Sequence, residues 1–168
     1  VTDIDDNILR QAKKVGLAWD ELARQETAAD GYDTAIILNQ LGKVAEGPGA
    51  CVMFVRDGKL ITPDPTSGIL ESITRDALMI LAREVLGMPV EERMVDRTEL
   101  YLADEVFFCG TAAEISPVTS VDRYRIGNGE IGPVTRELER VFEAVLRGTT
   151  SDYDEWRTPV GFAARVPA

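Results

Sequence analysis

The sequence contains no histidine, and this absence limits which side chains could carry chemistry. Catalytic triads that use histidine, zinc sites with histidine ligands and histidine general bases are all excluded. Proton transfer must then fall to lysine, acidic residues, tyrosine or cysteine. Most of the 18 basic residues are arginines, so a reactive lysine would be one of Lys13, Lys14, Lys43 and Lys59.

Three short segments have compositions that could bind an anionic ring. Glu46 precedes the bend 47–49 (Gly-Pro-Gly), and a carboxylate held there could keep a ring nitrogen protonated. The start of a helix predicted over 72–86 offers free N–H groups to a phosphate, and Thr74 adds a hydroxyl. Segment 110–113 (Gly-Thr-Ala-Ala) allows backbone N–H groups to approach an anion closely. Each segment alone also fits an ordinary turn or helix cap, so the interpretation depends on their combination.

Hydrophobic periodicity and turn residues predict a single α/β domain with many strands early in the chain. The 168 residues, 45% of them hydrophobic, suffice for one core without a disulfide or a metal. The predicted helices cover 4–29, 72–86, 97–103 and 133–147. The predicted strands cover 34–38, 50–55, 59–62, 90–95, 106–109 and 115–121. The polar tail after residue 149 is expected to pack loosely.

The formal net charge of −11 argues against nucleic acid and anionic membrane surfaces as partners. No apolar run approaches the roughly 20 residues of a membrane helix, and no charged-then-apolar leader opens the chain. Cys51 and Cys109 both lie in apolar stretches, so we expect reduced, buried thiols in a cytoplasmic protein. Two cysteines cannot form a four-thiolate zinc site, and we expect no metal.

The amino-acid sequences of several segments, and their order along the chain, resemble those of the class IV (fold type IV) pyridoxal-phosphate aminotransferases, and within them the branched-chain amino-acid aminotransferases. The resemblance covers about 22–148 and implies the large domain of that fold, with strands in a pseudo-barrel flanked by helices. Residues 1–21 would be a divergent helical lead and 149–168 a C-terminal tail. The segments that carry it are LARQETAADGYDTAIIL (22–38), GKVAEGPGACVMFVRDGKLITP (42–63), SGILESITRDALMILARE (67–84), DRTELYLADEVFFCGTAAEISPV (96–118) and GPVTREL (132–138).

This resemblance implies a site for pyridoxal 5'-phosphate. Glu46 would pair with the pyridine nitrogen, and Leu70 would pack on one face of the ring. The N–H groups of Ile73 and Thr74 and the side chain of Thr111 would hold the phosphate. Thr111, together with Ala112, would also lie near the carboxylate of the substrate, a small amino acid or keto acid.

The resemblance also implies a lysine that bonds to the cofactor and moves a proton at the substrate. Lys43 and Lys59 flank predicted hairpin turns and are expected in solvent. Lys13 and Lys14 both precede Glu46 at a separation that the family tolerates, and Lys13 is narrowly favoured. Exposure of both on a helix is an equally open interpretation.

The sequence departs from the family pattern ahead of residue 22. Family members have a smaller N-terminal domain before the lysine, which supplies an arginine to the phosphate and a wall of the substrate pocket. They also have Gly-Asn-Tyr where this chain has residues 16–19, Gly-Leu-Ala-Trp. We therefore expect a homodimer, or a protein partner that covers the face left by the missing domain.

Two interpretations of function stay open. In the first, the chain is an aminotransferase for a small aliphatic, branched-chain-like amino acid, with reduced or altered activity. In the second, it is a cofactor-free descendant that binds a ligand or a partner, or that reuses the cleft with Glu46, Asp104 or Glu114 as acid–base groups.

Overall fold

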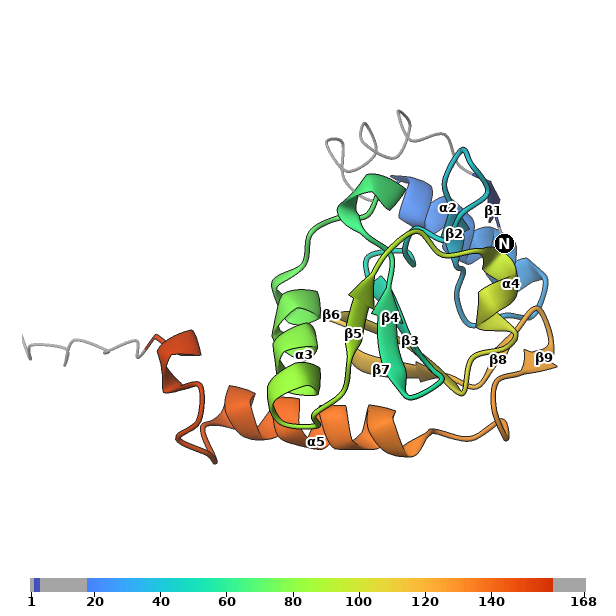
Figure 1. Cartoon of the computed structure of the whole chain (residues 1–168). Helices are drawn as coiled ribbons and strands as arrows, with labels where there is room; N and C mark the ends of the chain where they lie inside the picture. Colours follow the sequence, from blue (N-terminus) through green and yellow to red (C-terminus); the bar gives the residue numbers. More distant parts are fainter. Residues whose placement is uncertain (1, 4–17, 159–168) are drawn as a thin grey trace, which may run out of the picture.

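The computed structural model describes residues 2–3 and 18–158 (Figure 1). The helical elements are α2 (Ala18–Ala29), the 3₁₀ turn η1 (Pro65–Ser67), α3 (Ile73–Glu84), α4 (Arg97–Leu100), α5 (Pro133–Arg147) and the 3₁₀ turn η2 (Asp154–Trp156). The strands are β1 (Thr2–Asp3), β2 (Ile37–Leu38), β3 (Cys51–Arg56), β4 (Lys59–Thr62), β5 (Val90–Glu92), β6 (Glu105–Gly110), β7 (Glu114–Val118), β8 (Ser120–Val121) and β9 (Tyr124–Arg125).

A five-stranded sheet forms the centre of the fold, in the order β5-β4-β3-β6-β7. Neighbouring strands are antiparallel except β4 and β5, which are parallel. The register of the two inner strands places Met53 opposite Phe107 and Cys51 opposite Cys109. Every residue of β6 is buried, which explains why this strand is an almost continuous apolar run.

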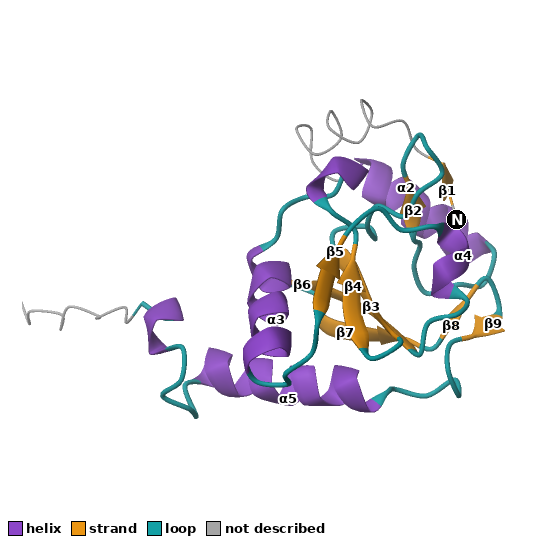
Figure 2. Ribbon diagram, in the orientation of Figure 1, coloured by secondary structure: helices purple, strands orange, loops and turns teal. Residues whose placement is uncertain are grey.

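Alternate residues of β3 and β6 contribute to two separate cores, one on each face of the sheet. Helices α3 and α5 cover one face, as Figure 2 shows. That core includes Met53, Leu78, Leu81, Phe107, Leu138 and Phe142. The opposite face packs against α4 and the segment around β2, and its core includes Ile36, Val44, Val52, Phe54, Leu100 and Phe108. The sheet is therefore covered on both sides, with its strand ends left for the connecting loops.

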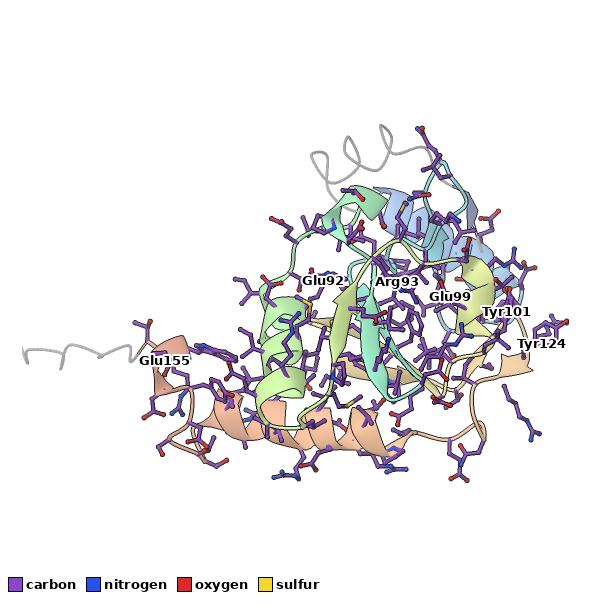
Figure 3. The ribbon with its side chains drawn as sticks, viewed as in Figure 1. Glu92, Arg93, Glu99, Tyr101, Tyr124 and Glu155 are labelled. Carbon is purple, nitrogen blue, oxygen red and sulfur yellow. The ribbon has the colours of Figure 1, made fainter. Side chains whose placement is uncertain are left out.

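Charged side chains position the short helix α4. Arg93 donates to both carboxylate oxygens of Glu99, at 2.9 and 2.7 Å, and Figure 3 labels the two residues. Glu99 also accepts a hydrogen bond from the N–H of Asp96 at 3.0 Å, which satisfies a donor at the start of the helix. The hydrogen bonds from Arg93 hold the pKa of Glu99 below its ordinary value, although partial burial opposes them.

A buried acid from β6 caps the long helix α5. Glu105 is 7% exposed and accepts from the N–H groups of Val134 (3.0 Å) and Thr135 (2.7 Å) and from the Thr135 hydroxyl (2.6 Å). Gly132 precedes the helix, and a Cβ at this position would lie 2.0 Å from Cδ of Glu105. Glycine at 132 thus makes room for the acid that fixes α5 to the sheet.

Most predicted elements are confirmed, some with different ends. The helix over 133–147 and the strand over 59–62 have the predicted bounds. The strand expected over 34–38 is reduced to β2, although residues 35–38 are buried. The strand expected over 115–121 divides after Val118, because the next residues pair with β9 instead of continuing along β6. The α/β class with helices flanking a sheet is confirmed.

Other expectations need correction or fall outside the described residues. The strand over 90–95 ends at Glu92, and the helix over 97–103 ends at Leu100. Of the helix expected over 4–29, the structure describes α2, and residues 4–17 lie outside the description. At the start of the C-terminal tail, most of residues 151–158 are exposed, and the Tyr153 hydroxyl donates to Glu84 of α3 at 2.9 Å. Over the described residues, no helix combines the length and the apolar character needed to cross a bilayer.

Replacing Glu105 with alanine should lower the free energy of unfolding by about 2–4 kcal/mol. A hydrogen bond to a charged group contributes about 1.5–3 kcal/mol, and the variant leaves two N–H groups of α5 without their acceptor. Chemical denaturation followed by circular dichroism measures the change. Glu137→Ala, which removes an exposed acid from the same helix, is the control and should change stability little. Equal effects of the two variants would contradict the capping role.

Candidate functional site

The bend before β3 is closed by its own backbone and carries a buried acid. Gly47 N–H donates to the carbonyl of Ala50 at 2.8 Å, and the reverse bond is 3.2 Å. Gly49 has a φ of 73°, a left-handed conformation that favours glycine. Glu46 is 4% exposed, so it is not the surface turn acid that the sequence left as an alternative. The bend therefore holds a carboxylate inside the protein at a fixed position.

Glycine at position 47 lets this bend pack directly against the sheet. A Cβ there would lie 2.4 Å from Cε1 of Phe108, well inside van der Waals contact. The side chain of Phe108 is buried in the core on that face. The absence of a side chain at Gly47 is thus a packing requirement that comes from β6.

The loop that precedes α3 is joined to the bend by two contacts. The Leu70 N–H donates to Oε2 of Glu46 at 2.9 Å. The carbonyl of Leu70 accepts from the Cys51 thiol, with sulfur and oxygen 3.4 Å apart. The side chain of Leu70 is itself 59% exposed, so it is free to pack on another molecule. Main-chain contacts therefore fix Leu70 beside Glu46.

The first turn of α3 presents two N–H groups that could bind an anion. Ser72 caps the helix, because its side chain accepts from the N–H of Arg75 at 3.3 Å and its carbonyl accepts from Asp76 at 3.0 Å. Within the described part of the chain, the N–H groups of Ile73 and Thr74 have no hydrogen-bond acceptor. Unsatisfied N–H groups and the helix dipole both favour a negative charge at this position.

The corner between β6 and β7 (residues 110–113) lies next to the bend that follows Glu46 and to the N-terminal end of α3, called the tip of α3 below. A Cβ on Gly110 would lie 3.4 Å from the carbonyl oxygen of Gly49, so the corner touches the bend. Gly110 and Thr111 line a pocket of about 520 Å³ together with Ile73 and Thr74. Ala112 and Thr111 are both exposed. The three segments singled out by their sequences therefore meet at one place.

The remaining lining of this pocket is largely apolar, with two acids and one cation. It is formed by Asp76, Ala77, Ile80, Glu114, Phe142, Val145, Leu146, Trp156 and Arg157. Among the described residues, the buried Nε of Arg157 has no hydrogen-bond partner. The guanidinium of Arg157 is otherwise paired with Asp154, so the two free N–H groups of α3 are the donors that suit an anionic group such as a phosphate.

The two cysteines flank the site but are unsuited to catalysis. Both are buried and unlinked, as expected from the sequence. Burial raises the pKa of the Cys109 thiol far above its ordinary value, the neighbouring Cys51 raises it further, and Arg75 opposes them. A protonated, buried thiol is a poor nucleophile. We assign the cysteines to packing between β3 and β6.

The described lysines form ion pairs. Lys43 pairs with Asp96, and Lys59 pairs with Glu91 at 2.6 Å, and their side chains are 31% and 44% exposed, so both reach solvent as the sequence predicted. Lys13 and Lys14, the candidates for bonding a cofactor, lie outside the described residues, as do residues 16 and 17. The choice between the two lysines stays a prediction.

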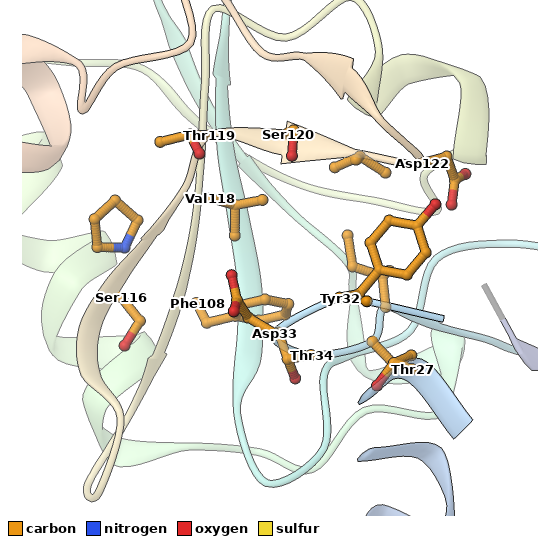
Figure 4. Close-up of a pocket in the computed structure, with 15 residues that line it drawn as sticks. Thr27, Tyr32, Asp33, Thr34, Phe108, Ser116, Val118, Thr119, Ser120 and Asp122 are labelled. Carbon is orange, nitrogen blue, oxygen red and sulfur yellow. The ribbon is translucent and has the colours of Figure 1, made fainter. Parts of the chain in front are cut away.

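A second pocket, of about 380 Å³, lies between β7 and the loop after α2 (Figure 4). Its lining includes Asp33 and Asp122 but no lysine or arginine. Asp122 accepts from the hydroxyl of Tyr101 and from Arg97, at 2.5 and 2.9 Å. Two acids and no cation make this pocket unsuitable for a phosphate. Its residues come mostly from loops, and no motif in the sequence predicted it.

Comparisons with known proteins agree with this geometry. The family model for amino-transferase class IV matches residues 2–121. The chain belongs to the class IV aminotransferase family. This class IV chain is 48% identical over 158 residues to a probable branched-chain-amino-acid aminotransferase of Aquifex aeolicus, which covers 93% of the chain and 51% of that protein. It is 46% identical over 135 residues to the branched-chain-amino-acid aminotransferase of Escherichia coli, covering 80% of the chain and 43% of that protein.

Solved structures of the family are similar as well. The PLP-form of the branched-chain amino acid aminotransferase from Thermobaculum terrenum has a TM-score of 0.83 and 61% identity. The similarity covers 85% of this chain and 47% of that one. The class IV chain thus spans about half the length of the relatives that it matches.

Replacing Gly47 with alanine should destabilise the protein by about 1–3 kcal/mol, the usual cost of overpacking a core. The added methyl must displace either the ring of Phe108 or the bend that carries Glu46. Thermal and chemical unfolding measure the change. The control is Gly58→Ala, where no atom lies within 4 Å of the added carbon and only the left-handed backbone (φ 72°) is strained. A smaller effect at Gly47 than at Gly58 would contradict the packing argument.

Proposed function

We propose that this class IV chain binds pyridoxal 5'-phosphate and transfers amino groups on a branched-chain or similar small aliphatic amino acid. One observation carries the proposal: the bend with Glu46, the tip of α3 and the corner at Gly110 meet, and the tip keeps two N–H groups without acceptors. Support for the substrate comes from relatives named branched-chain-amino-acid aminotransferases.

The phosphate would be held at the tip of α3 and the corner. The N–H groups of Ile73 and Thr74 would donate to it, and the hydroxyl of Thr111, in the lining of the same pocket, would add a third donor. A favourable helix dipole adds about 0.3–1 kcal/mol, and up to about 2 kcal/mol in a partly buried geometry. Arg157 lies in the lining of the same pocket, with its guanidinium paired to Asp154.

The ring would lie beside the bend. Glu46 would face the ring nitrogen and favour its protonated form, because an opposite charge nearby stabilises a cation. When bound, the cofactor supplies an electron sink for the carbanion that forms at the α-carbon of the substrate. Leu70 would pack on one ring face, and its N–H bond to Glu46 links the position of the apolar contact to that of the acid.

Proton transfer would be the task of Lys13 or Lys14, with Lys13 narrowly favoured. A lysine must be neutral to accept a proton, and burial beside other cations lowers the pKa of an amine. Thr111 and Ala112 would bind the substrate carboxylate from the corner. Their exposure leaves the corner accessible to a small amino acid or keto acid.

We also propose that a second copy of the chain, or another protein, covers the face around this pocket. Ile73 is 90% exposed, Leu146 51% and Trp156 38%, and all three line the pocket. Contiguous exposed apolar side chains of this kind mark an interaction surface. A cytoplasmic location stays a prediction from the reduced cysteines.

Addition of pyridoxal phosphate to the chain should shift the cofactor's absorbance, because a lysine amine reacts with its aldehyde. The double variant Lys13→Ala, Lys14→Ala should abolish the shift, and the two single variants identify the lysine that reacts. Lys43→Ala and Lys59→Ala are matched controls and should keep it. A shift that persists in the double variant would exclude both candidates, and no binding by the intact chain would favour a cofactor-free descendant.

Replacing Glu46 with glutamine should lower the rate of amino transfer at least tenfold while the cofactor still binds. A charged hydrogen bond contributes about 1.5–3 kcal/mol, which is roughly a tenfold to hundredfold change in rate. Single-turnover conversion of bound cofactor by leucine measures the rate. Glu71→Gln changes an exposed acid on the same loop as Leu70 and should leave the rate unchanged. Equal rates for the two variants would remove Glu46 from the site.

A further inference from the structure

Arg75 is a buried cation directly behind the proposed phosphate site. It lies in the first turn of α3, is 2% exposed and is among the largest fully buried side chains. A guanidinium is costly to bury unless its donors are paired. The patterns in the sequence did not single it out, because an arginine within a helix is ordinarily solvated.

The guanidinium joins α3 to two strands of the sheet. Its Nε donates to the hydroxyl of Thr62 at 3.1 Å, at the end of β4. Its Nη2 donates to the carbonyl of Pro63 at 2.9 Å and to Oε2 of Glu92 on β5 at 2.8 Å. Figure 3 labels Glu92 near α3 and β5. Thr62 is fully buried, and its hydroxyl donates to the carbonyl of Val52 on β3 at 3.0 Å. Arg75 is thereby linked to β3 through Thr62.

These contacts hold together the two ends of the loop 63–72, which carries Leu70, the residue proposed to pack on the ring. The connection from β4, which ends at Thr62, to α3 spans residues 63–72, and Leu70 lies within it. Arg75 binds the start of the loop through Pro63 and holds its end through its own backbone N–H, which the Ser72 side chain accepts. The positions of the N–H groups of Ile73 and Thr74 are therefore set by a neighbouring side chain that faces away from them, into the sheet.

We propose that Arg75 is a positioning residue for the phosphate subsite, an inference that rests on the proposed function. It does not touch the phosphate. It fixes the two free N–H groups of the first turn of α3 at the distance from Thr111 that a phosphate requires. Lysine cannot replace it, because a single ammonium on a flexible stem does not reproduce a planar fork that donates to four acceptors, with Nη1 reaching Asp76 at 3.5 Å.

The test compares two ligands that differ only in the phosphate, namely pyridoxamine phosphate and pyridoxamine. Neither has an aldehyde, so the reactive lysine does not contribute to binding. Dissociation constants are measured by quenching of tryptophan fluorescence for the intact chain and for Arg75→Lys. The variant should bind pyridoxamine phosphate about tenfold more weakly or worse, since charged hydrogen bonds are misplaced. Its affinity for pyridoxamine should change by no more than about twofold, because this ligand presents no phosphate to the helix tip.

Arg83→Lys is the matched control, since Arg83 lies on the same helix, is about half exposed and reaches Glu92 only at 3.9 Å. It should leave both affinities unchanged. If Arg75→Lys unfolds in a thermal scan, Thr62→Val replaces it as the test, because it removes the acceptor of Nε and keeps the side-chain shape. It too should weaken binding of pyridoxamine phosphate and leave binding of pyridoxamine unchanged. Equal losses for both ligands, or no loss for either, would overturn the proposal. Failure of the intact chain to bind pyridoxamine phosphate would instead refute the proposed function.

Discussion

The antiparallel pairing of β3 with β6 is the constraint on which the site depends. β3 begins just after the bend of Glu46, and β6 ends just before the corner of Thr111. Because the strands run in opposite directions, the start of one lies beside the end of the other, with Cys51 opposite Cys109. Two segments about sixty residues apart in the chain are thereby brought into contact by the backbone hydrogen bonds of the sheet, and the packing of Gly47 on Phe108 adds to this contact. The tip of α3 completes the arrangement through the bond between Leu70 and Glu46.

The sequence predicts the parts of this fold whose signals are local. The helix over 133–147 has a proline in its first turn, a glycine after its end and a regular apolar stripe, and its bounds agree with the structure. The three segments that meet at the proposed site are also recognisable, because glycine, proline and cap residues have local meaning. The boundaries that failed, near residues 34 and 119, depend on which strand pairs with which, and no local pattern contains that information.

The burial of two charged side chains, Glu46 and Arg75, could not be predicted from the sequence. Glu46 follows the pattern of a surface turn, and its burial results from packing of Gly47 on Phe108, a residue distant in the chain. Arg75 has the pattern of an exposed helical residue, and its partners Thr62 and Glu92 lie on separate strands. In both cases the decisive neighbours are placed by tertiary structure. Such residues are therefore distinguished in the tertiary structure by a buried, hydrogen-bonded charge.

The contact between Gly132 and Glu105 has a consequence for how this family can diverge. Position 132 has no room for a side chain as long as position 105 carries a long acid, and the acid is needed as long as the helix after 132 lacks another cap. A change at either position alone is harmful, whereas a paired change, a shorter residue at 105 with a serine or aspartate at 132, restores both the space and the acceptor. The two positions should therefore covary across descendants.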